Sequence, residues 1–217
     1  MAINEKGVLD WKTILLDTSV IASLFNSENP KSTDDKITFI RELIDYLSDS
    51  NASDGKPRKF LIPSIVLTEL LVKENDQEKI KRILRVLNSS NVEFIDFDVD
   101  TALLFNHQLY PYLTKEQLHS FAEEFGFKTN DFMMAREWIN RDFMIIMCGV
   151  SNKVDVILTA DKKTFYPLTK KVNAFCALVY REYFEKPHRS VTKYYHAEAF
   201  EGNEEKPAQF KKPQKQI

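Results

Sequence analysis

Hydrophobic residues follow two patterns that alternate along the chain. Short, largely apolar runs predict buried strands, and they lie at residues 13–16, 60–63, 154–158 and 174–180. A further predicted strand, "VEFIDFDVD" from Val92, alternates apolar with acidic residues. Between the strands, apolar residues recur at helical spacing, over residues 19–25, 36–47, 65–75, 77–87 and much of 101–148. Strands that alternate with helices predict an α/β fold with a mostly parallel central sheet flanked by helices.

Polar interruptions of this pattern predict how the chain is divided. Residues 26–35 predict a loop, and the long helical stretch is broken near Pro111 and around residues 125–127. After Lys186 the apolar periodicity is lost, and a polar sequence with little to pack continues to the last residue. We therefore expect one main domain over residues 1–186 and a polar, flexible C-terminal tail over residues 187–217.

Composition and charge narrow the class of protein further. The 217 residues are 43% apolar and 29% charged with a formal net charge of −2, so no global basic field indicates nucleic acid. Cys148 and Cys176 each lie in an apolar run, which predicts buried thiols in a reducing compartment. The N-terminus lacks an apolar signal sequence, and the longest apolar stretch is too short to cross a bilayer. We expect a cytoplasmic protein with no membrane partner.

Two predicted strands end on an aspartate. Asp17 follows the first apolar run directly, and Asp161 follows "VILTA". Ligands of parallel α/β sheets bind outside the carboxyl ends of the strands, where both residues are expected. A carboxylate in such a place has to be solvated, paired or bound to a metal, because burying it alone is costly. The structural alternative for each aspartate is a helix cap or a turn.

Two further acids occupy helix faces that are otherwise apolar. Glu69 shares a face with Ile65, Val66 and Val72, and Asp142 shares one with Ile145, Ile146 and Gly149. The structural alternatives are an exposed ion pair of Glu69 with Lys73, and pairing of Asp142 with Arg136 or Arg141. Four acids therefore stand out, two at strand ends and two on helices.

These four acids lie in segments that resemble the signature blocks of the PIN-domain nucleases, the family of the VapC-like ribonucleases. The segments are "LLDTSVI", "IPSIVLTELL", "RDFMIIMCGV" and "VDVILTADKKTF", in the order of the family. The resemblance covers about residues 13–72 and 130–180, and it implies a PIN-like three-layer fold. Helical insertions near residues 28–59 and 98–130, together with the tail, depart from the usual compact form of the family.

Carried over position by position, the resemblance implies roles for individual residues. Four acids would be catalytic: Asp17, Glu69, Asp142 and Asp161. Of these, Asp17, Asp142 and Asp161 would bind the metal, and Glu69 would orient the attacking water. Thr18, Ser19 and Thr159 match hydroxyl positions of the family and are expected to contact substrate. Local positive charge, rather than the resemblance, adds Lys162 and Lys163 to the expected substrate contacts. The two lysines directly follow Asp161, and their alternative role is that of a solvated turn.

The charge and the ligand type of such a site favour a bound metal ion. Four converging carboxylates repel one another unless a counter-charge is present, and oxygen-only ligands favour hard cations such as Mg²⁺ or Mn²⁺. The expected activity is that of a metal-dependent endoribonuclease that hydrolyses RNA phosphodiester bonds, with a toxin of a toxin–antitoxin pair as one context. The expected partners are RNA and an antitoxin or other protein, and a homodimer is one option for the oligomeric state.

Two other functions stay open from the sequence. A non-catalytic PIN-like scaffold that binds RNA or protein would use the same fold without chemistry. A phosphatase of the haloacid-dehalogenase type would need a second aspartate two residues after Asp17, and that position holds Ser19.

Overall fold

The five strands form one sheet in which every pairing is parallel. The computed structural model describes residues 8–25, 35–72, 74–109, 114–124, 132–171, 174 and 176–179. The strands are β1 (Thr13–Leu16), β2 (Lys59–Pro63), β3 (Val92–Ile95), β4 (Val156–Thr159) and β5 (Cys176–Leu178). Their order in the sheet is β3-β2-β1-β4-β5. The prediction of an α/β fold with a parallel central sheet is confirmed.

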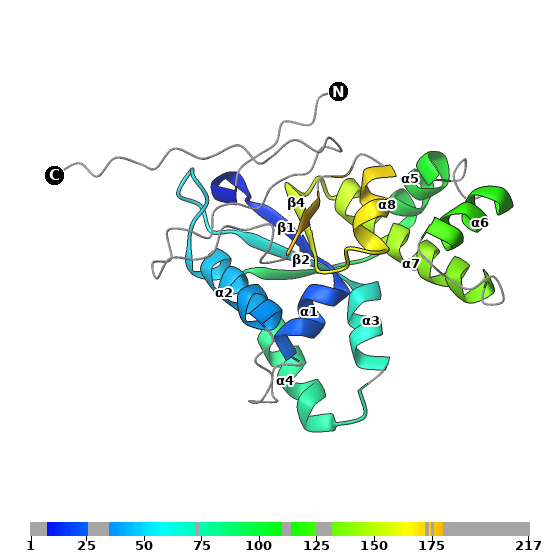
Figure 1. Cartoon of the computed structure of the whole chain (residues 1–217). Helices are drawn as coiled ribbons and strands as arrows, with labels where there is room; N and C mark the ends of the chain where they lie inside the picture. The colour runs from blue at the N-terminus through cyan, green and yellow to red at the C-terminus, as the bar shows by residue number, and fades with distance from the viewer. Residues whose placement is uncertain are drawn as a thin grey trace.

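Helices cover both faces of this sheet (Figure 1). Those that connect β1 to β2 and β2 to β3 are α1 (Thr18–Phe25), α2 (Asp35–Asp49), α3 (Ser64–Val72) and α4 (Gln77–Leu87). Those of the later crossovers are α5 (Val99–Leu109), α6 (Lys115–Glu124), α7 (Phe132–Ser151) and α8 (Phe165–Lys171). Right-handed crossovers place the first group on one face and the second on the other, because the chain moves in opposite directions across the sheet.

The core lies between the sheet and these helices. Strands β1 and β4 are buried almost throughout, with Ile14, Leu15 and Leu158 fully inaccessible to solvent. Helix α2 belongs to this core, since Phe39, Ile40, Leu43 and Leu47 form its buried stripe. Apolar strands of this kind are expected where helices cover both sides of a parallel sheet.

The strand predicted from Val92 is shorter than expected. Strand β3 ends at Ile95, and the apolar Phe94 within it is 41% exposed. Two features explain the difference. β3 is an edge strand, so one flank lacks a covering neighbour. Asp98 then starts α5 by accepting the backbone N–H of Thr101 at 2.8 Å, which ends the extended conformation.

The other predicted elements agree with the structure to within a few residues. β4 begins at Val156 and β5 is confined to Cys176–Leu178, so both are shorter than their apolar runs. The expected helix breaks near Pro111 and residues 125–127, the loop over 26–34 and the tail lie outside the described residues. Cys148 and Cys176 are buried and unbonded to each other, as predicted. No helix in the described part of the chain combines the length and apolarity needed to cross a membrane.

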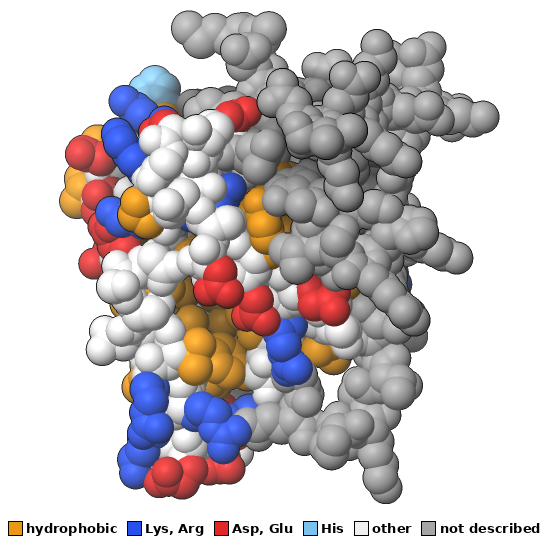
Figure 2. All heavy atoms as spheres, turned by 90° about the vertical axis from the view of Figure 1, so that its left-hand side faces the viewer, with side chains coloured by type: hydrophobic (Ala, Val, Ile, Leu, Met, Phe, Trp, Pro, Cys, Tyr) orange, Lys and Arg blue, Asp and Glu red, His pale blue; other side chains and the backbone are white. Residues whose placement is uncertain are grey.

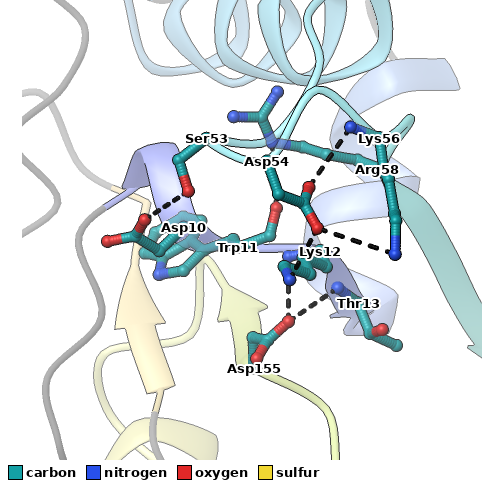
Figure 3. A network of polar contacts seen from close by, with 9 residues as sticks. All are labelled: Asp10, Trp11, Lys12, Thr13, Ser53, Asp54, Lys56, Arg58 and Asp155. Carbon is teal, nitrogen blue, oxygen red and sulfur yellow. Dashed lines mark hydrogen bonds and ion pairs between the residues drawn. The ribbon is translucent and has the colours of Figure 1, made fainter.

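A polar network joins the segments around the amino ends of β1 and β2 (Figure 3). We call it the amino edge, and it consists of Asp10, Lys12, Ser53, Asp54, Lys56, Arg58 and Asp155, with the backbone of residues 8–13 and 50. Arg58 is 2% exposed and donates to the carbonyls of Trp11 (3.0 Å), Ser50 (2.6 Å) and Val8 (3.3 Å). Asp155 accepts the N–H groups of Lys12 and Thr13 at 2.8 and 2.9 Å. Each charge here has a partner.

Positive and negative side chains are interspersed on the face of the molecule seen in Figure 2. The described atoms of this face carry no extended field of a single sign, which agrees with the formal net charge of −2. Any surface on this face that attracts a polyanion is therefore local, in line with the expectation from the composition.

Candidate active site

The strand order changes direction between β1 and β4. From β1 the chain moves outward to β2 and β3, and it then returns to place β4 on the other side of β1. In open α/β sheets, ligands bind in the crevice at such a switch point, outside the carboxyl ends of the strands. Asp17 follows β1 directly, and Asp161 lies two residues after the end of β4. The two aspartates that the sequence singles out are thus brought to one place.

Asp17 is buried at this switch point by a network of hydroxyl groups. It is 4% exposed, and its Oδ2 accepts the hydroxyls of Ser19 (2.6 Å) and Thr159 (2.8 Å) and the Ser19 N–H (3.3 Å). The two hydroxyls in turn accept the N–H groups of Ala160 and Asp161 at 2.8 and 3.0 Å. The hydroxyl hydrogens are therefore directed at Asp17, which ties the end of β1 to the turn after β4.

Burial changes the protonation of Asp17. Removal from water raises the pKa of its carboxyl from 3.8 to about 6, although the hydrogen bonds from Ser19 and Thr159 oppose the rise. The three hydrogen bonds described above arrive at Oδ2, and Oδ1 takes none of them. The Thr18 backbone N–H also donates to this carboxyl, so the protein itself holds the carboxylate in place.

Asp161 caps the turn that leads into α8. Its Oδ1 accepts the N–H groups of Lys163 (2.8 Å) and Thr164 (3.0 Å), and its Oδ2 accepts the Thr164 hydroxyl. The structural alternative for this residue, a turn or cap, is thus observed. Capping does not exclude a ligand role, because each carboxylate oxygen has two lone pairs. Thr164 holds this carboxylate, and its position three residues after the aspartate is the signal by which it could have been found.

Glu69 projects from α3 toward α1 and α7. One carboxylate oxygen accepts the Thr18 hydroxyl, and the other lies 3.0 Å from the Nη1 of Arg141. The pairing with Lys73 cannot be compared, since Lys73 lies outside the described residues. The expected face is also shorter than predicted, because Val72 is 74% exposed at the end of the helix while Val66 is buried.

Asp142 sits on α7 one turn before the residues that pack on the sheet. Ile145 and Ile146 are fully buried, and a Cβ on Gly149 would lie 3.0 Å from the Ile157 side chain of β4. Helix α7 therefore approaches the sheet closely, and this approach fixes the position of Asp142. Its carboxylate makes no hydrogen bond with any residue that the structure describes, in contrast to Asp17 and Asp161.

The electrostatics of Asp142 link all four acids. Its pKa is raised well above the ordinary value, first by burial and then by the negative charges of Asp17, Asp161 and Glu69. Arg141 opposes this rise, and it is the residue that pairs with Glu69 rather than with Asp142. We call Asp17, Glu69, Asp142 and Asp161 the acidic edge. The pairing of Arg141 is the contact that the sequence did not predict, because α3 and α7 are far apart along the chain.

The expected substrate contacts have two different environments. Thr18, Ser19 and Thr159 lie inside the acidic edge and are engaged with Glu69 and Asp17. Lys162 and Lys163 are exposed on the turn directly after Asp161. His107 and His119 are exposed on α5 and α6, away from the four acids along the chain, and His119 lies 3.4 Å from Glu123 of its own helix.

The donor set of the acidic edge is suited to a hard divalent cation, since it consists of carboxylate oxygens with hydroxyls behind them. Asp142 has no donor among the described residues, and three neighbouring carboxylates disfavour its charge, so a cation would stabilise it. Yet no three His, Cys, Asp or Glu side chains in the described ranges are placed as closely as metal ligands are. Binding would therefore require side-chain adjustment.

A comparison with solved structures gives a weak structural likeness. No protein-family model and no curated protein matches the chain. A solved structure, the crystal structure of VapBC2 from Rickettsia felis bound to a DNA fragment from their promoter, aligns with a TM-score of 0.45 and 18% identity. The alignment covers 76% of this chain and 96% of that chain. At this level the likeness assigns neither family nor activity to the present chain.

Proposed function

We propose that this protein is a metal-dependent endoribonuclease of the PIN type, with Mg²⁺ or Mn²⁺ as its cofactor. The observation that carries the proposal is Asp142, a carboxylate without a hydrogen-bond donor among the described residues and surrounded by Asp17, Asp161 and Glu69. Such an arrangement opposes folding unless it serves a ligand, because like charges in a poorly solvated site repel. The resemblance of the four sequence segments to PIN-domain nucleases supports the same conclusion.

The residues of the site have separate roles in the proposed hydrolysis. Asp17, Asp142 and Asp161 would hold the metal, which when bound polarises the phosphodiester and lowers the pKa of a water. Ser19 and Thr159 hold Asp17, and Thr164 holds Asp161, so these two carboxylates start from defined positions, and side-chain adjustment would bring the ligands around the cation. Thr18 and Arg141 each contact one oxygen of Glu69 and so fix the orientation of its carboxylate. In this orientation Glu69 would direct the attacking water toward phosphorus. Lys162 and Lys163 would bind flanking phosphates of the RNA.

A non-catalytic scaffold that binds RNA or protein is the second candidate function. The observation that favours it is the spacing of the acids, since no three potential ligands in the described part already form a metal-binding group. The two candidates differ in one property, because only a nuclease requires that the acids come together around a cation.

The biological context is a separate proposal. A ribonuclease of this type can serve as the toxin of a toxin–antitoxin pair, with an antitoxin or another protein as its partner. Growth arrest on expression in a bacterial host, with relief by Asp17→Asn, would support a toxin. Normal growth together with RNA cleavage in vitro would support the nuclease activity and contradict the role as a toxin.

The decisive experiment is a cleavage assay on a mixture of defined single-stranded and structured RNAs. We expect endonucleolytic products with Mg²⁺ or Mn²⁺ and none with EDTA, whereas a scaffold gives none in any condition. Thermal unfolding provides a second readout, since a cation that binds only the native site raises the midpoint by mass action. In Asp17→Asn/Asp161→Asn this metal-induced shift should largely disappear. An unchanged shift in that variant would place the cation elsewhere.

A further inference from the structure

We infer that Arg141 binds a phosphate of the substrate backbone inside the acidic edge, with Glu69 and Thr18 holding its guanidinium in place. The inference rests on the proposed function, since it assigns the way in which an RNA backbone enters that site. It concerns substrate binding and therefore can be tested without cleavage.

The geometry leaves most of the guanidinium available. Arg141 contacts Glu69 through Nη1 at 3.0 Å, and the second oxygen of Glu69 accepts the Thr18 hydroxyl. A guanidinium has five N–H donors, and the remaining ones make no hydrogen bond with the described residues. The Arg141 side chain is 39% exposed, whereas that of Glu69 is 19% exposed. The group is thus anchored on one side and open to solvent on the other.

Electrostatics require a cation at this position. A polyanion that approaches Asp17, Glu69, Asp142 and Asp161 meets four carboxylates, and a bound metal would offset only part of their charge. Arg141 lowers the pKa of Asp142, the carboxylate that has no donor among the described residues, so the guanidinium lies within electrostatic reach of it. Lys162 and Lys163 lie on the exposed turn after β4 and are suited to flanking phosphates instead.

The chemistry of arginine fits a phosphodiester. Its planar fork donates two parallel hydrogen bonds to phosphate oxygens, and it keeps its charge at any physiological pH. The anchor on Glu69 reduces the side-chain freedom that would be lost on binding. A merely structural ion pair would have the same contact with Glu69 but would contribute nothing to RNA affinity, and this difference is measurable.

The test measures binding of a fluorescein-labelled single-stranded RNA by anisotropy in EDTA, at several salt concentrations. Arg141→Ala and Arg141→Gln should each weaken binding by about tenfold and lower the slope of log affinity against log salt by about one. Gln keeps a donor for Glu69, so it separates loss of charge from loss of the anchor. Arg141→Lys should retain the slope and lose less affinity. Arg136→Ala, on the exposed part of the same helix, is the matched control and should overlay the wild type.

The outcomes separate this inference from the proposed function. Wild-type affinity and slope in Arg141→Ala and Arg141→Gln, with reduced cleavage turnover, would overturn the inference and leave Arg141 as a positioning residue for Glu69. If the wild-type protein cleaves no RNA but the Arg141 variants weaken its RNA binding, the proposed nuclease activity is overturned and the inference is supported. A wild-type protein that neither binds nor cleaves RNA would overturn both.

Discussion

The two ends of the parallel sheet carry similar charged residues but differ in how the charges are paired. At the amino edge, Asp54 lies 2.7 Å from Lys12 and 3.9 Å from Lys56, and Asp155 accepts two backbone N–H groups. The buried Arg58 is surrounded by carbonyl and hydroxyl oxygens and lies over the ring of Tyr46. At the acidic edge, Arg141 pairs with Glu69, and the pKa of Asp142 is raised by three carboxylates and lowered by Arg141. Polar density is high at both ends, but among the described residues Asp142 has no hydrogen-bond donor, unlike the carboxylates of the amino edge.

This difference separates a structural role from a functional one. At the amino edge Lys12 lowers the pKa of Asp54, as an ion pair does when it stabilises the charged forms. At the acidic edge burial raises the pKa values of Asp17 and Asp142, and like charges add to the rise at Asp142, so the fold disfavours the charged forms. Ionisable groups whose charged form is destabilised by the fold cluster at functional sites, where a ligand of opposite charge stabilises that form.

The largest expected effect is loss of cleavage in Asp17→Asn. We expect activity to fall by more than about a hundredfold, because a ligand role needs the negative charge. Asn is itself a good cap, so the start of α1 should be kept. Asp155→Asn, the matched change at the amino edge, should retain cleavage per folded molecule. Near-normal cleavage in Asp17→Asn, measured with the same RNAs and metals, would remove Asp17 from the site.

The complementary change at the amino edge is Arg58→Ala. We expect it to lower the free energy of unfolding by about 3–5 kcal/mol, because several buried acceptors lose their donor at once. Urea unfolding followed by circular dichroism measures this loss, and Arg85→Ala on the exposed face of α4 is the control. A loss below about 1 kcal/mol would show that the amino edge contributes little to stability.

The pH dependence of stability should reveal the acidic edge. Asp17 has a pKa of 3.8 when unfolded and about 6 when folded, so its protonated form is favoured by folding. Stability from this group is therefore complete below about pH 4 and is lost as the pH rises through 6, by up to about 3 kcal/mol. Asp142 contributes in the same direction.

Urea unfolding in EDTA between pH 4 and 7 measures this slope. In Asp17→Asn the slope should decrease and the free energy of unfolding at pH 7 should increase. Asp54→Asn is the control at the amino edge, where the pKa is lowered and the pH dependence has the opposite sign. A wild-type stability that rises steadily over this range would contradict the electrostatic account of the site.

The smallest expected effect concerns the exposed turn after β4. Lys162→Ala/Lys163→Ala should weaken RNA binding and lower its salt slope by up to about two, one for each neutralised phosphate. Turnover at saturating RNA should change much less, because the four acids are untouched. Lys79→Ala/Lys81→Ala on α4 is the matched loss of two charges. A salt dependence equal to that of the wild type would show that the two lysines are only solvated turn residues and that RNA binds along another part of the surface.

Periodicity predicted most of the fold because burial constrains apolar positions locally. The runs that became β1, β2 and β4 are buried on both faces, and Gln77–Leu87 forms a helix with the predicted bounds. The strand predicted from Val92 forms, but it ends at Ile95, earlier than predicted, at the sheet edge, where alternation carries less information. Position in the sheet is a property of the whole chain, so no local pattern reports it.

The sequence by itself determined which acids stand out, since a carboxylate at the end of an apolar strand or on an apolar helix face is visible in the pattern. Only the tertiary structure decided which partners they have. It placed Thr159 against Asp17, Thr18 and Arg141 against Glu69, and no donor from the described residues against Asp142. The physical reason is that hydrogen bonds and charge interactions act over a few ångströms in space. The residues that supply them here come from α1, α7 and β4, which only the folded chain brings together.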